Sequence, residues 1–319
     1  MRSRFGGGSF SLFMTETPRS SSGSALLAVL WLLAFLSFLI VTTMMVVMQG
    51  VSTSGSREMV FRARQLAEQG LSLGVHPAMK ATDPMLHQQL SGGESFDVVI
   101  TSEESRLNIN AFLTDDKRQV LERLFGSWGL DPPDAQTVVD CLMDWVDQDD
   151  FKRMRGAEHE DYKKEGYPDR PYNRPFASLD EMELVLGMDL VAKANPNWRE
   201  AFTLWGAGAV DINEASAPII AAVANVMPDK AQSLVSLRDG PDGVAHTPDD
   251  LPVESIEQAM TELGANPGDA SIAGNFTLKG TTLRVRSVGR VGGYARGVDA
   301  VVQSSQGGVQ ILEWREFVP

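Results

Sequence analysis

The clearest hydrophobic pattern in the sequence is an uninterrupted apolar run near its beginning. Residues 24–48 contain no charged residue, no glycine and no proline. As a helix rising ~1.5 Å per residue, this run spans roughly 37 Å, more than the ~30 Å hydrocarbon core of a bilayer. The apolar part of a signal peptide has only about 7–15 residues. The pattern therefore predicts a membrane-spanning helix, either as an ordinary single-pass anchor or as part of a more specialised protein.

The helical pattern continues past this run without an obvious break. Met59, Leu66 and Leu71 recur at near-helical spacing among charged residues. We therefore expect one helix from residue 24 to about residue 75, apolar on all sides at first and amphipathic afterwards. The second half is suited to packing on a domain. Arginines flank the apolar run on both sides, so the positive-inside rule leaves the orientation open.

Beyond this helix, two strand-like regions enclose a long helical one. The expected strands lie at 96–100, 106–109, 282–291, 295–303 and 309–317, with hairpin turns at Gly292-Gly293 and Gly307-Gly308. The expected helices lie at 113–128, 134–146, 178–186, 217–226 and 230–237. The predicted fold class is α+β, in which an antiparallel sheet is begun before Asn110 and completed after Gly274. A large all-helical insertion separates its two parts.

Composition and charge narrow the possible functions. The chain has 42 acidic against 28 basic residues and a formal net charge of −14. Nucleic-acid affinity depends mainly on Lys and Arg displacing counterions, so this charge disfavours nucleic acid as a partner. Cys141 is the one cysteine of the sequence, which excludes an internal disulfide. Its apolar neighbours indicate a small buried hydrophobic side chain.

An acidic cluster is the best candidate for ion binding. Asp144, Asp147, Asp149 and Asp150 follow closely on one another, and Glu158 comes shortly after them. Asp144 and Asp147 are three residues apart and share a helix face, and the other two could turn back from a loop. Clustered carboxylates suit calcium, which takes six to eight oxygen ligands. A solvated acidic helix end explains the same pattern, and the spacing is not that of an EF-hand, so chemistry alone leaves both open.

Two asparagines lie at positions typical of helix caps. Asn110 and Asn213 each follow an apolar-polar-Ile pattern, and we expect them to cap the helices that follow. Helix-hairpin-helix DNA-binding modules begin in a similar way, but they need a Gly-rich hairpin to bind phosphate, and residues 224–230 contain no glycine.

The sequence contains no pattern typical of an enzyme. The four histidines are scattered, and no nucleophile elbow or nucleotide-binding glycine pattern occurs. We therefore predict no catalytic residue.

The beginning of the chain resembles the type IV pilins and pseudopilins. A basic leader with Arg2, Arg4 and Arg19 ends at Gly23, directly before the apolar helix. The resemblance implies that a prepilin peptidase cleaves between Gly23 and Ser24 and methylates the new amino terminus. Most members of that class carry Glu at the fifth mature position, where this sequence has Ala28. The resemblance links this departure to a subunit at the filament tip, although Ala at this position also suits a lipid-facing helix.

The rest of the chain is similar to the large minor pseudopilins of type II secretion, the general secretion pathway protein K family. The matching words, in family order, are GSALL at 23–27, RLNIN at 106–110, DWVD at 144–147, GAE at 156–158, PYNRP at 171–175, SLDE at 178–181, VDIN at 210–213 and WRE at 314–316. The resemblance implies a pilin-like long N-terminal helix packed on an antiparallel sheet, with an inserted domain of two SAM-like helical bundles. The implied parts are a leader (1–23), a transmembrane helix (24–48), the first pilin-like part (49–109), two helical domains (110–209 and 210–274) and the closing strands (275–319).

This resemblance also implies a function. The chain would be a minor pseudopilin at the tip of the periplasmic pseudopilus, together with other minor pseudopilins, and would help to initiate pseudopilus assembly for protein export. It would cross the inner membrane once, with its C-terminal domain in the periplasm, and contact the prepilin peptidase and the type II secretion apparatus. The resemblance implies calcium binding in the helical domain, so calcium and a solvated helix end stand equal as explanations of the acidic cluster. The alternative is a membrane-anchored helix-hairpin-helix DNA-binding protein of the competence type.

Overall fold

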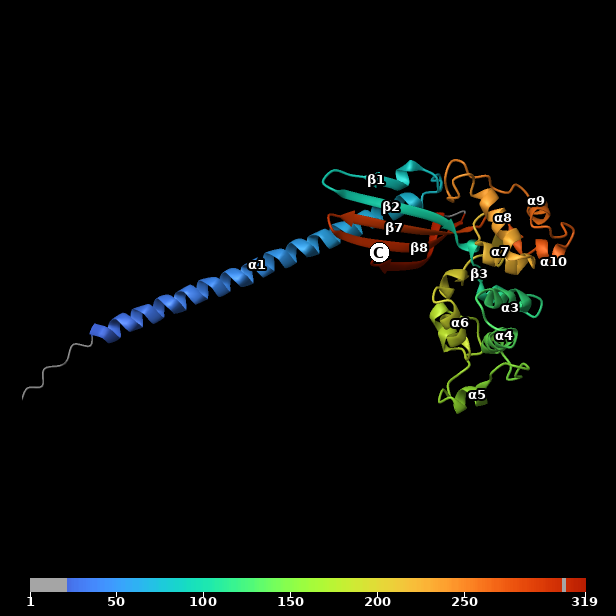
Figure 1. Ribbon diagram of the computed structural model, residues 1–319, viewed down its shortest axis with the longest axis horizontal. Helices are drawn as coiled ribbons and strands as arrows, with labels where there is room; N and C mark the ends of the chain where they lie inside the picture. Colours follow the sequence, from blue (N-terminus) through green and yellow to red (C-terminus); the bar gives the residue numbers. More distant parts are fainter. Residues whose placement is uncertain (1–21, 306–307) are drawn as a thin grey trace, which may run out of the picture. The chain divides into compact units, whose positions relative to one another are not determined.

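The computed structural model describes residues 22–305 and 308–319, and the side chains of residues 24–45, 56–304 and 308–319. The predicted leader lies outside this range except for its last two residues. The contacts within the chain divide it into two compact units, Met1–Glu58 and Met59–Pro319. A single helix, α1 (Ser22–Gly74), runs through the division, as the hydrophobic pattern predicts (Figure 1).

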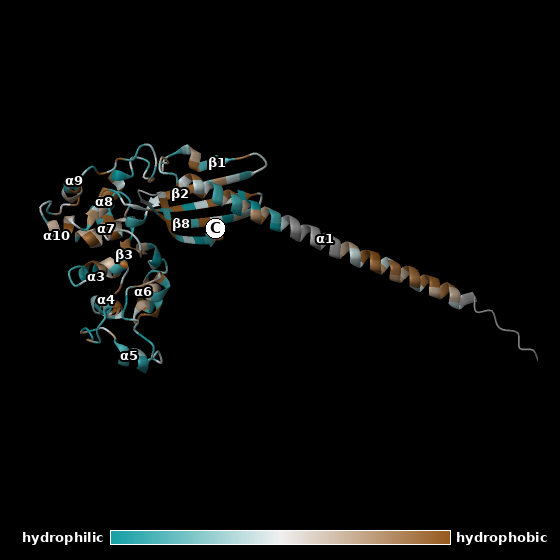
Figure 2. Cartoon of the chain, turned by 180° about the vertical axis from the view of Figure 1, so that it is seen from behind, coloured by the Kyte–Doolittle hydropathy of each residue, from teal (hydrophilic) through white to brown (hydrophobic). Residues whose placement is uncertain are grey.

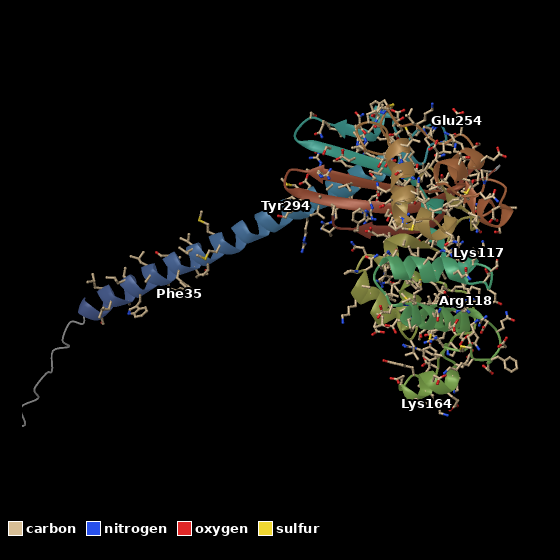
Figure 3. The ribbon with its side chains drawn as sticks, turned by 45° about the vertical axis from the view of Figure 1, so that its right-hand side comes forward. Phe35, Lys117, Arg118, Lys164, Glu254 and Tyr294 are labelled. Carbon is tan, nitrogen blue, oxygen red and sulfur yellow. The ribbon has the colours of Figure 1, made fainter. Side chains whose placement is uncertain are left out.

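In the first unit, α1 carries the apolar run. Its stretch Ser24–Met45 is long and apolar enough to cross a membrane. The stretch appears as a continuous brown band in Figure 2. Its side chains stand away from the helix, as Phe35 does in Figure 3, with 61% of that residue exposed. The hydroxyls of Thr42 and Thr43 donate to carbonyls one turn back, at 2.9 Å and 2.7 Å, so these polar groups need no outside partner.

In the second unit, a five-stranded antiparallel sheet packs on the last turns of α1. The strand order is β1-β2-β7-β8-β9, and all neighbouring strands are antiparallel (Figure 1). The strands are β1 (His87–Gln89), β2 (Glu94–Ser102), β7 (Thr282–Val291), β8 (Tyr294–Ser305) and β9 (Gly308–Phe317). The core between helix and sheet consists of Ala63, Leu66, Ala67, Leu71, Leu86, Phe96, Val98, Ile100, Val285, Val291, Val298, Ala300 and Val302. This spacing on α1 is the amphipathic face that the sequence predicts.

The helix and the sheet approach most closely at Gly289 on β7. A Cβ atom at this position would lie 2.1 Å from the Ala63 carbonyl oxygen and 2.6 Å from the Ala67 nitrogen. Real Cβ atoms do not come this near to backbone atoms, so only glycine fits between β7 and α1 at this distance. The absence of a side chain therefore sets the spacing of the two layers.

The helical region is inserted between β2 and β7, as the sequence predicts. Its helices are α2 (Ile109–Phe112), α3 (Arg118–Ser127), α4 (Pro132–Val146), α5 (His159–Lys164), α6 (Met188–Ala194), α7 (Ala217–Ala224), α8 (Pro228–Arg238), α9 (Ile256–Glu262) and α10 (Ala270–Ala273). The 3₁₀ turns are η1 (Pro84–Leu86), which precedes β1, then η2 (Glu103–Ser105), η3 (Leu179–Leu184) and η4 (Trp198–Ala201). Two short parallel pairs fasten this region: β3 (Leu107–Asn108) with β4 (Phe202–Thr203), and β5 (Val210–Asp211) with β6 (Phe276–Thr277).

One hydrophobic cluster runs through the whole helical region. It includes buried residues from α3 and α4 as well as from α7, α8 and α9. Cys141 belongs to it, and burial raises the pKa of its thiol to about 12, which confirms the small buried side chain that the sequence indicates. The division of the region into two bundles stays a prediction.

Several local predictions need correction. The two asparagines expected to cap helices instead hold distant segments by backbone hydrogen bonds. The Asn110 side chain accepts from the Phe176 nitrogen at 2.9 Å and donates to the Phe176 carbonyl at 3.0 Å. Asn213 binds the Val253 backbone in the same two-way manner, at 2.8 Å and 3.1 Å. Asn110 lies inside α2, and Ser216 rather than Asn213 directly precedes α7, so the capping prediction is wrong for both.

Element boundaries also differ in places. The helix expected at 113–128 begins only at Arg118, and the segment expected as a helix at 178–186 is the 3₁₀ turn η3. Three strand predictions after Gly274 are confirmed to within one or two residues. The Gly292-Gly293 hairpin joins β7 and β8, with Gly292 at a φ of 56°. Of the second predicted turn, Gly307 lies outside the described residues.

Candidate functional site

The acidic cluster lies where α4 ends and a loop leads to α5. Asp144 is in the last turn of α4 and is fully buried, at 0% exposed. Asp147 ends the helix, Asp149 and Asp150 lie in the exposed loop, and Glu158 directly precedes α5. The residues that flank Asp144 in α4, Leu142, Met143 and Trp145, belong to the hydrophobic cluster. This part of the helix is therefore packed inward, and the Asp144 side chain is buried with it. We call these five residues the Asp144 cluster.

Arg153, from the loop, neutralises part of this buried charge. Its Nη1 donates to Asp144 Oδ1 at 2.9 Å and also binds Asp147 Oδ2. Its backbone nitrogen donates to Asp144 Oδ2 at 3.1 Å. Burial raises the pKa of both aspartates, and the guanidinium opposes that rise. The loop thus folds back over the end of α4 through Arg153, and the Arg155 backbone nitrogen adds a hydrogen bond to Asp140 Oδ2 at 3.1 Å.

Glu158 is the least compensated member of the cluster. The residue is 7% exposed, and its side chain is directed toward the Asp161 backbone nitrogen in a capping box at the start of α5. Within the described part of the chain, however, neither of its carboxylate oxygens makes a hydrogen bond. Burial, and then the negative charges of Asp144, Asp147, Asp150 and Asp149, raise the pKa of Glu158 to about 7. A buried carboxylate without a partner among like charges is costly to the folded state.

Gly156 lets the loop come close to Asp144. A Cβ atom at Gly156 would lie 1.8 Å from Asp144 Oδ2, so any side chain here would displace the carboxylate. Gly156 is buried, and Glu158 follows it two residues later. The GAE word at 156–158 therefore places the Gly156 backbone against Asp144 and brings Glu158 close to the same site.

The donor chemistry of the cluster fits a calcium ion. Asp147 Oδ1 is a further buried oxygen without a partner, beside the two oxygens of Glu158. Calcium prefers such carboxylate oxygens. Among the described side chains, however, no three Asp, Glu, His or Cys residues are arranged to hold a metal ion. Arg153 forms ion pairs with both Asp144 and Asp147 instead. Asp144, Asp147 and Glu158 would hold the cation, with the exposed aspartates adding charge.

Aromatic packing supports the cluster from below. Trp145, next to Asp144, packs edge-on against Tyr162 of α5 with ring centroids 5.6 Å apart. It also stacks on Phe176 at 6.2 Å and packs on Tyr172 at 4.9 Å, both close to the PYNRP word. The end of α4, α5 and the segment at 171–176 therefore form one rigid base under the acids.

A second polar site joins the sheet to the helical region. Glu103, which is 0% exposed, receives two parallel hydrogen bonds from Arg284 of β7, at 2.7 Å and 2.8 Å. Arg106 and Thr203 bind the same carboxylate, at 3.0 Å and 2.5 Å. Burial alone would raise the pKa of Glu103, but Arg284 and Arg106 hold it below its ordinary value. This bidentate pair fixes the helical region on the sheet.

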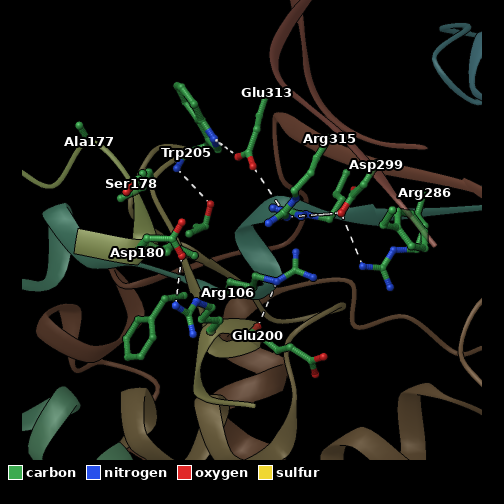
Figure 4. A pocket seen from close by; sticks show the side chains of 17 residues that line it. Arg106, Ala177, Ser178, Asp180, Glu200, Trp205, Arg286, Asp299, Glu313 and Arg315 are labelled. Carbon is green, nitrogen blue, oxygen red and sulfur yellow. Dashed lines mark hydrogen bonds and ion pairs between the residues drawn. The ribbon is translucent and has the colours of Figure 1, made fainter. Parts of the chain in front are cut away.

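Next to this pair, a cleft of about 760 Å³ opens between the sheet and the segments 177–180 and 199–205 of the helical region. Figure 4 shows charged side chains from both walls directed into it. We call it the arginine cleft and define it by six of its lining residues: Arg106, Arg284, Arg286, Asp299, Glu313 and Arg315. Asp299 is buried, and three guanidiniums converge on its Oδ2, Arg284 at 3.0 Å and Arg286 and Arg315 at 3.6 Å.

This second site was not predicted from the sequence. Glu103 and Arg284 are 181 residues apart, and the alternation of the strand shows only that Arg284 faces one side of the sheet. A pair of adjacent acids before the RLNIN word was the one available signal. No local pattern indicates which arginine they meet.

Comparison with known proteins gives a family for part of the chain. Residues 105–196 match the model of the family described as type II secretion system, protein K. Type II secretion system protein K of Pseudomonas aeruginosa is 26% identical over 200 residues, which cover 60% of this chain and 56% of that protein. Protein K of Dickeya chrysanthemi is 35% identical over 71 residues (22% of this chain, 19% of that protein). Protein K of Klebsiella pneumoniae is 30% identical over 109 residues (31% and 33%).

The fold agrees with a solved structure. A chain of the crystal structure of the GspK-GspI-GspJ complex from the enterotoxigenic Escherichia coli type 2 secretion system matches with a TM-score of 0.61 and 15% identity. The match covers 85% of this chain and 100% of that chain, which confirms the predicted pilin-like fold with a helical insert. None of these comparisons supports the DNA-binding alternative. Residues 105–196 thus match the family described as type II secretion system, protein K, and the chain has the fold of a chain in the GspK-GspI-GspJ complex.

Proposed function

We propose that the chain is a minor pseudopilin of a type II secretion system, placed at the tip of the periplasmic pseudopilus. Its apolar helix anchors it in the inner membrane by a single pass, with the C-terminal part in the periplasm. Its partners are other minor pseudopilins, the prepilin peptidase and the secretion apparatus. It acts as a structural subunit that helps to initiate assembly and catalyses no reaction.

The observation that carries this proposal is the protein K domain at residues 105–196, inserted in a sheet that packs on the end of an apolar helix. Moving such a helix from lipid into water is very unfavourable, so assembly must transfer it directly into contacts with other helices. The inserted region is too bulky to repeat along a thin fibre, which suits a subunit that has no other above it.

The first test examines processing of the amino terminus in cells with the prepilin peptidase. Mass spectrometry of the membrane-extracted protein is expected to find a methylated Ser24 as its first residue. Gly23→Ala is expected to slow the cleavage, because a side chain obstructs the extended backbone at the cut, whereas Gly8→Ala in the same leader leaves it unchanged. An intact Met1, or a cut beyond Met48, would contradict the proposal.

The second test examines assembly. The full chain, extracted in a mild detergent, is expected to co-purify with the other minor pseudopilins of its own secretion system. If the chain is cleaved and methylated but binds none of these proteins, the processing proposed above holds, and the proposed place in a tip complex is contradicted.

We also propose that the Asp144 cluster binds calcium. The proposal rests on the orphaned oxygens of Glu158 and Asp147 and on the like charges around them. A bound Ca²⁺ supplies the positive charge that Arg153 supplies only in part, and it ties the loop after α4 to the start of α5. Arg153 and the ion compete for the same two aspartates.

Calorimetric titration of the full chain with calcium tests this site. Glu158→Gln is expected to weaken binding by roughly tenfold or more, since it removes a ligand charge from a small site. Glu160→Gln, an exposed acid on α5, is the matched control and is expected to leave the affinity unchanged. Arg153→Gln removes the competing cation and is expected to strengthen binding. Equal affinities in the wild type and Glu158→Gln would show that calcium does not use this cluster.

A further inference from the structure

Two guanidiniums in the arginine cleft have hydrogen-bonding capacity that the fold does not use. The side chains of Arg286 and Arg315 are 56% and 59% exposed, and each lies 3.6 Å from Asp299, longer than a hydrogen bond. Arg315 also lies 3.7 Å from Glu313, again beyond hydrogen-bond distance. Neither donates a hydrogen bond to any described residue. Each guanidinium has five donors in a planar fork that matches a carboxylate. Asp299 therefore aligns these two cations without satisfying them.

The other arginines of the cleft are already engaged. Arg284 binds Glu103 through two nitrogens and Asp299 through a third. Arg106 binds Glu103 through one nitrogen and donates from Nε to the Glu200 carbonyl at 3.0 Å. These contacts hold the floor of the cleft rigid. The free donors are concentrated on Arg286 of β7 and Arg315 of β9, which lie on either side of Asp299 of β8 in the strand register.

The walls of the cleft are built to receive a peptide. The indole of Trp205 donates to Glu313 at 3.0 Å, which fixes the aromatic wall beside β9 (Figure 4). The Arg286 guanidinium lies 4.9 Å from the centre of the Phe317 ring, so this cation is held over an apolar surface. β9 is the last strand of the sheet order, and no strand of the described chain pairs with its outer side. The arginine cleft therefore combines a volume of about 760 Å³, a wall fixed by the Trp205–Glu313 hydrogen bond and the unused guanidinium donors of Arg286 and Arg315.

We propose that the arginine cleft binds an acidic peptide segment of a partner protein, whose Asp or Glu carboxylates are received by Arg286 and Arg315. Charge makes this place selective. The chain carries a net −14, so an acidic segment is repelled by most of its surface and attracted where two cations stand exposed. The cleft also has carboxylates, Asp180, Glu200, Asp299 and Glu313, so the preference for an acidic segment rests on the two exposed arginines, which would repel a basic segment placed over them.

The test uses acetylated, amidated hexaglutamate as the probe and the full chain in a non-ionic detergent at low salt. Trp205 lines the cleft, so tryptophan fluorescence reports binding. We expect saturable binding that weakens as salt is added, and no such binding of hexalysine. The double variant Arg286→Gln/Arg315→Gln is expected to bind at least about fivefold more weakly, since it loses two charge-assisted contacts. Both side chains are largely exposed, so the fold is expected to stay intact, which circular dichroism checks.

Arg296→Gln is the matched control. Arg296 lies on β8, donates to the Ala295 carbonyl at 2.8 Å and does not line the cleft. It is expected to bind the probe as the wild type does. Equal affinity of the wild type and the double variant, an equal loss in Arg296→Gln, or no saturable binding to the wild type would each overturn the proposal. Because the probe is a synthetic peptide, the result is independent of whether the chain assembles with other pseudopilins.

Discussion

Gly289→Ala tests whether the spacing of α1 and the sheet is set by a missing side chain. The new Cβ would lie 2.1 Å from the Ala63 carbonyl oxygen and 2.6 Å from the Ala67 nitrogen. An ordinary contact needs about 3.4 Å or more, so the helix must move outward by roughly 1.3 Å. Both clashing atoms are backbone, and no rotamer change relieves them.

The expected cost follows from this displacement. Overpacking of a core costs about 1–3 kcal/mol, and a clash between two backbones belongs at the upper end of that range. Replacing glycine by alanine also lowers the conformational entropy of the unfolded chain, which offsets about 0.4–1 kcal/mol of this loss in the free energy of unfolding. We therefore expect the second unit to lose about 2–3 kcal/mol, or roughly 5–10 °C in its melting temperature. Gly293→Ala, in the adjoining hairpin with nothing within 4 Å of its Cβ, is the control, expected to change the melting temperature little.

Thermal unfolding of the full chain in detergent, followed by near-ultraviolet circular dichroism, measures the difference. Hydrogen exchange of the β7 and α1 amides locates it. If Gly289→Ala melted within a degree of Gly293→Ala, the helix would be free to shift. The close approach would then not determine the packing, and the reasoning from the absent Cβ would be refuted.

Further predictions concern the two polar sites. Gly156→Ala pushes the Asp144 carboxylate away from the loop, so we expect a loss of about 2–4 kcal/mol in chemical denaturation and weaker calcium binding in the titration. Glu103→Gln leaves Arg284 without its bidentate partner and is expected to cost about 3 kcal/mol by the same denaturation assay. Because the folded state holds the pKa of Glu103 below its ordinary value, its stabilisation is complete above pH ~4.5 and is lost as the pH falls through the folded pKa. Acid titration of stability is therefore expected to be less steep in Glu103→Gln than in the wild type, and equal slopes would contradict the assignment.

The sequence by itself determined the elements that depend on local periodicity. The apolar run predicts the first helix because residues 24–48 include no charged residue, glycine or proline over 25 consecutive positions. A segment of that length and composition is long enough to span a bilayer as a helix. Alternation fixed β7 at 282–291, the range predicted for it, because successive side chains point to opposite faces. The same patterns gave the α+β class and the place of the helical insertion.

Only the tertiary structure decided which polar groups meet. Asn110 reads as a helix cap from its neighbours, yet it binds the backbone of Phe176, 66 residues later. Glu103 needs Arg284 from the other part of the sheet, and Glu158 becomes an orphaned acid only when the loop folds onto α4. A hydrogen bond or ion pair between distant segments depends on the path of the whole chain. Periodicity records the face on which a side chain lies, but it carries no information about the partner that the fold brings to that face.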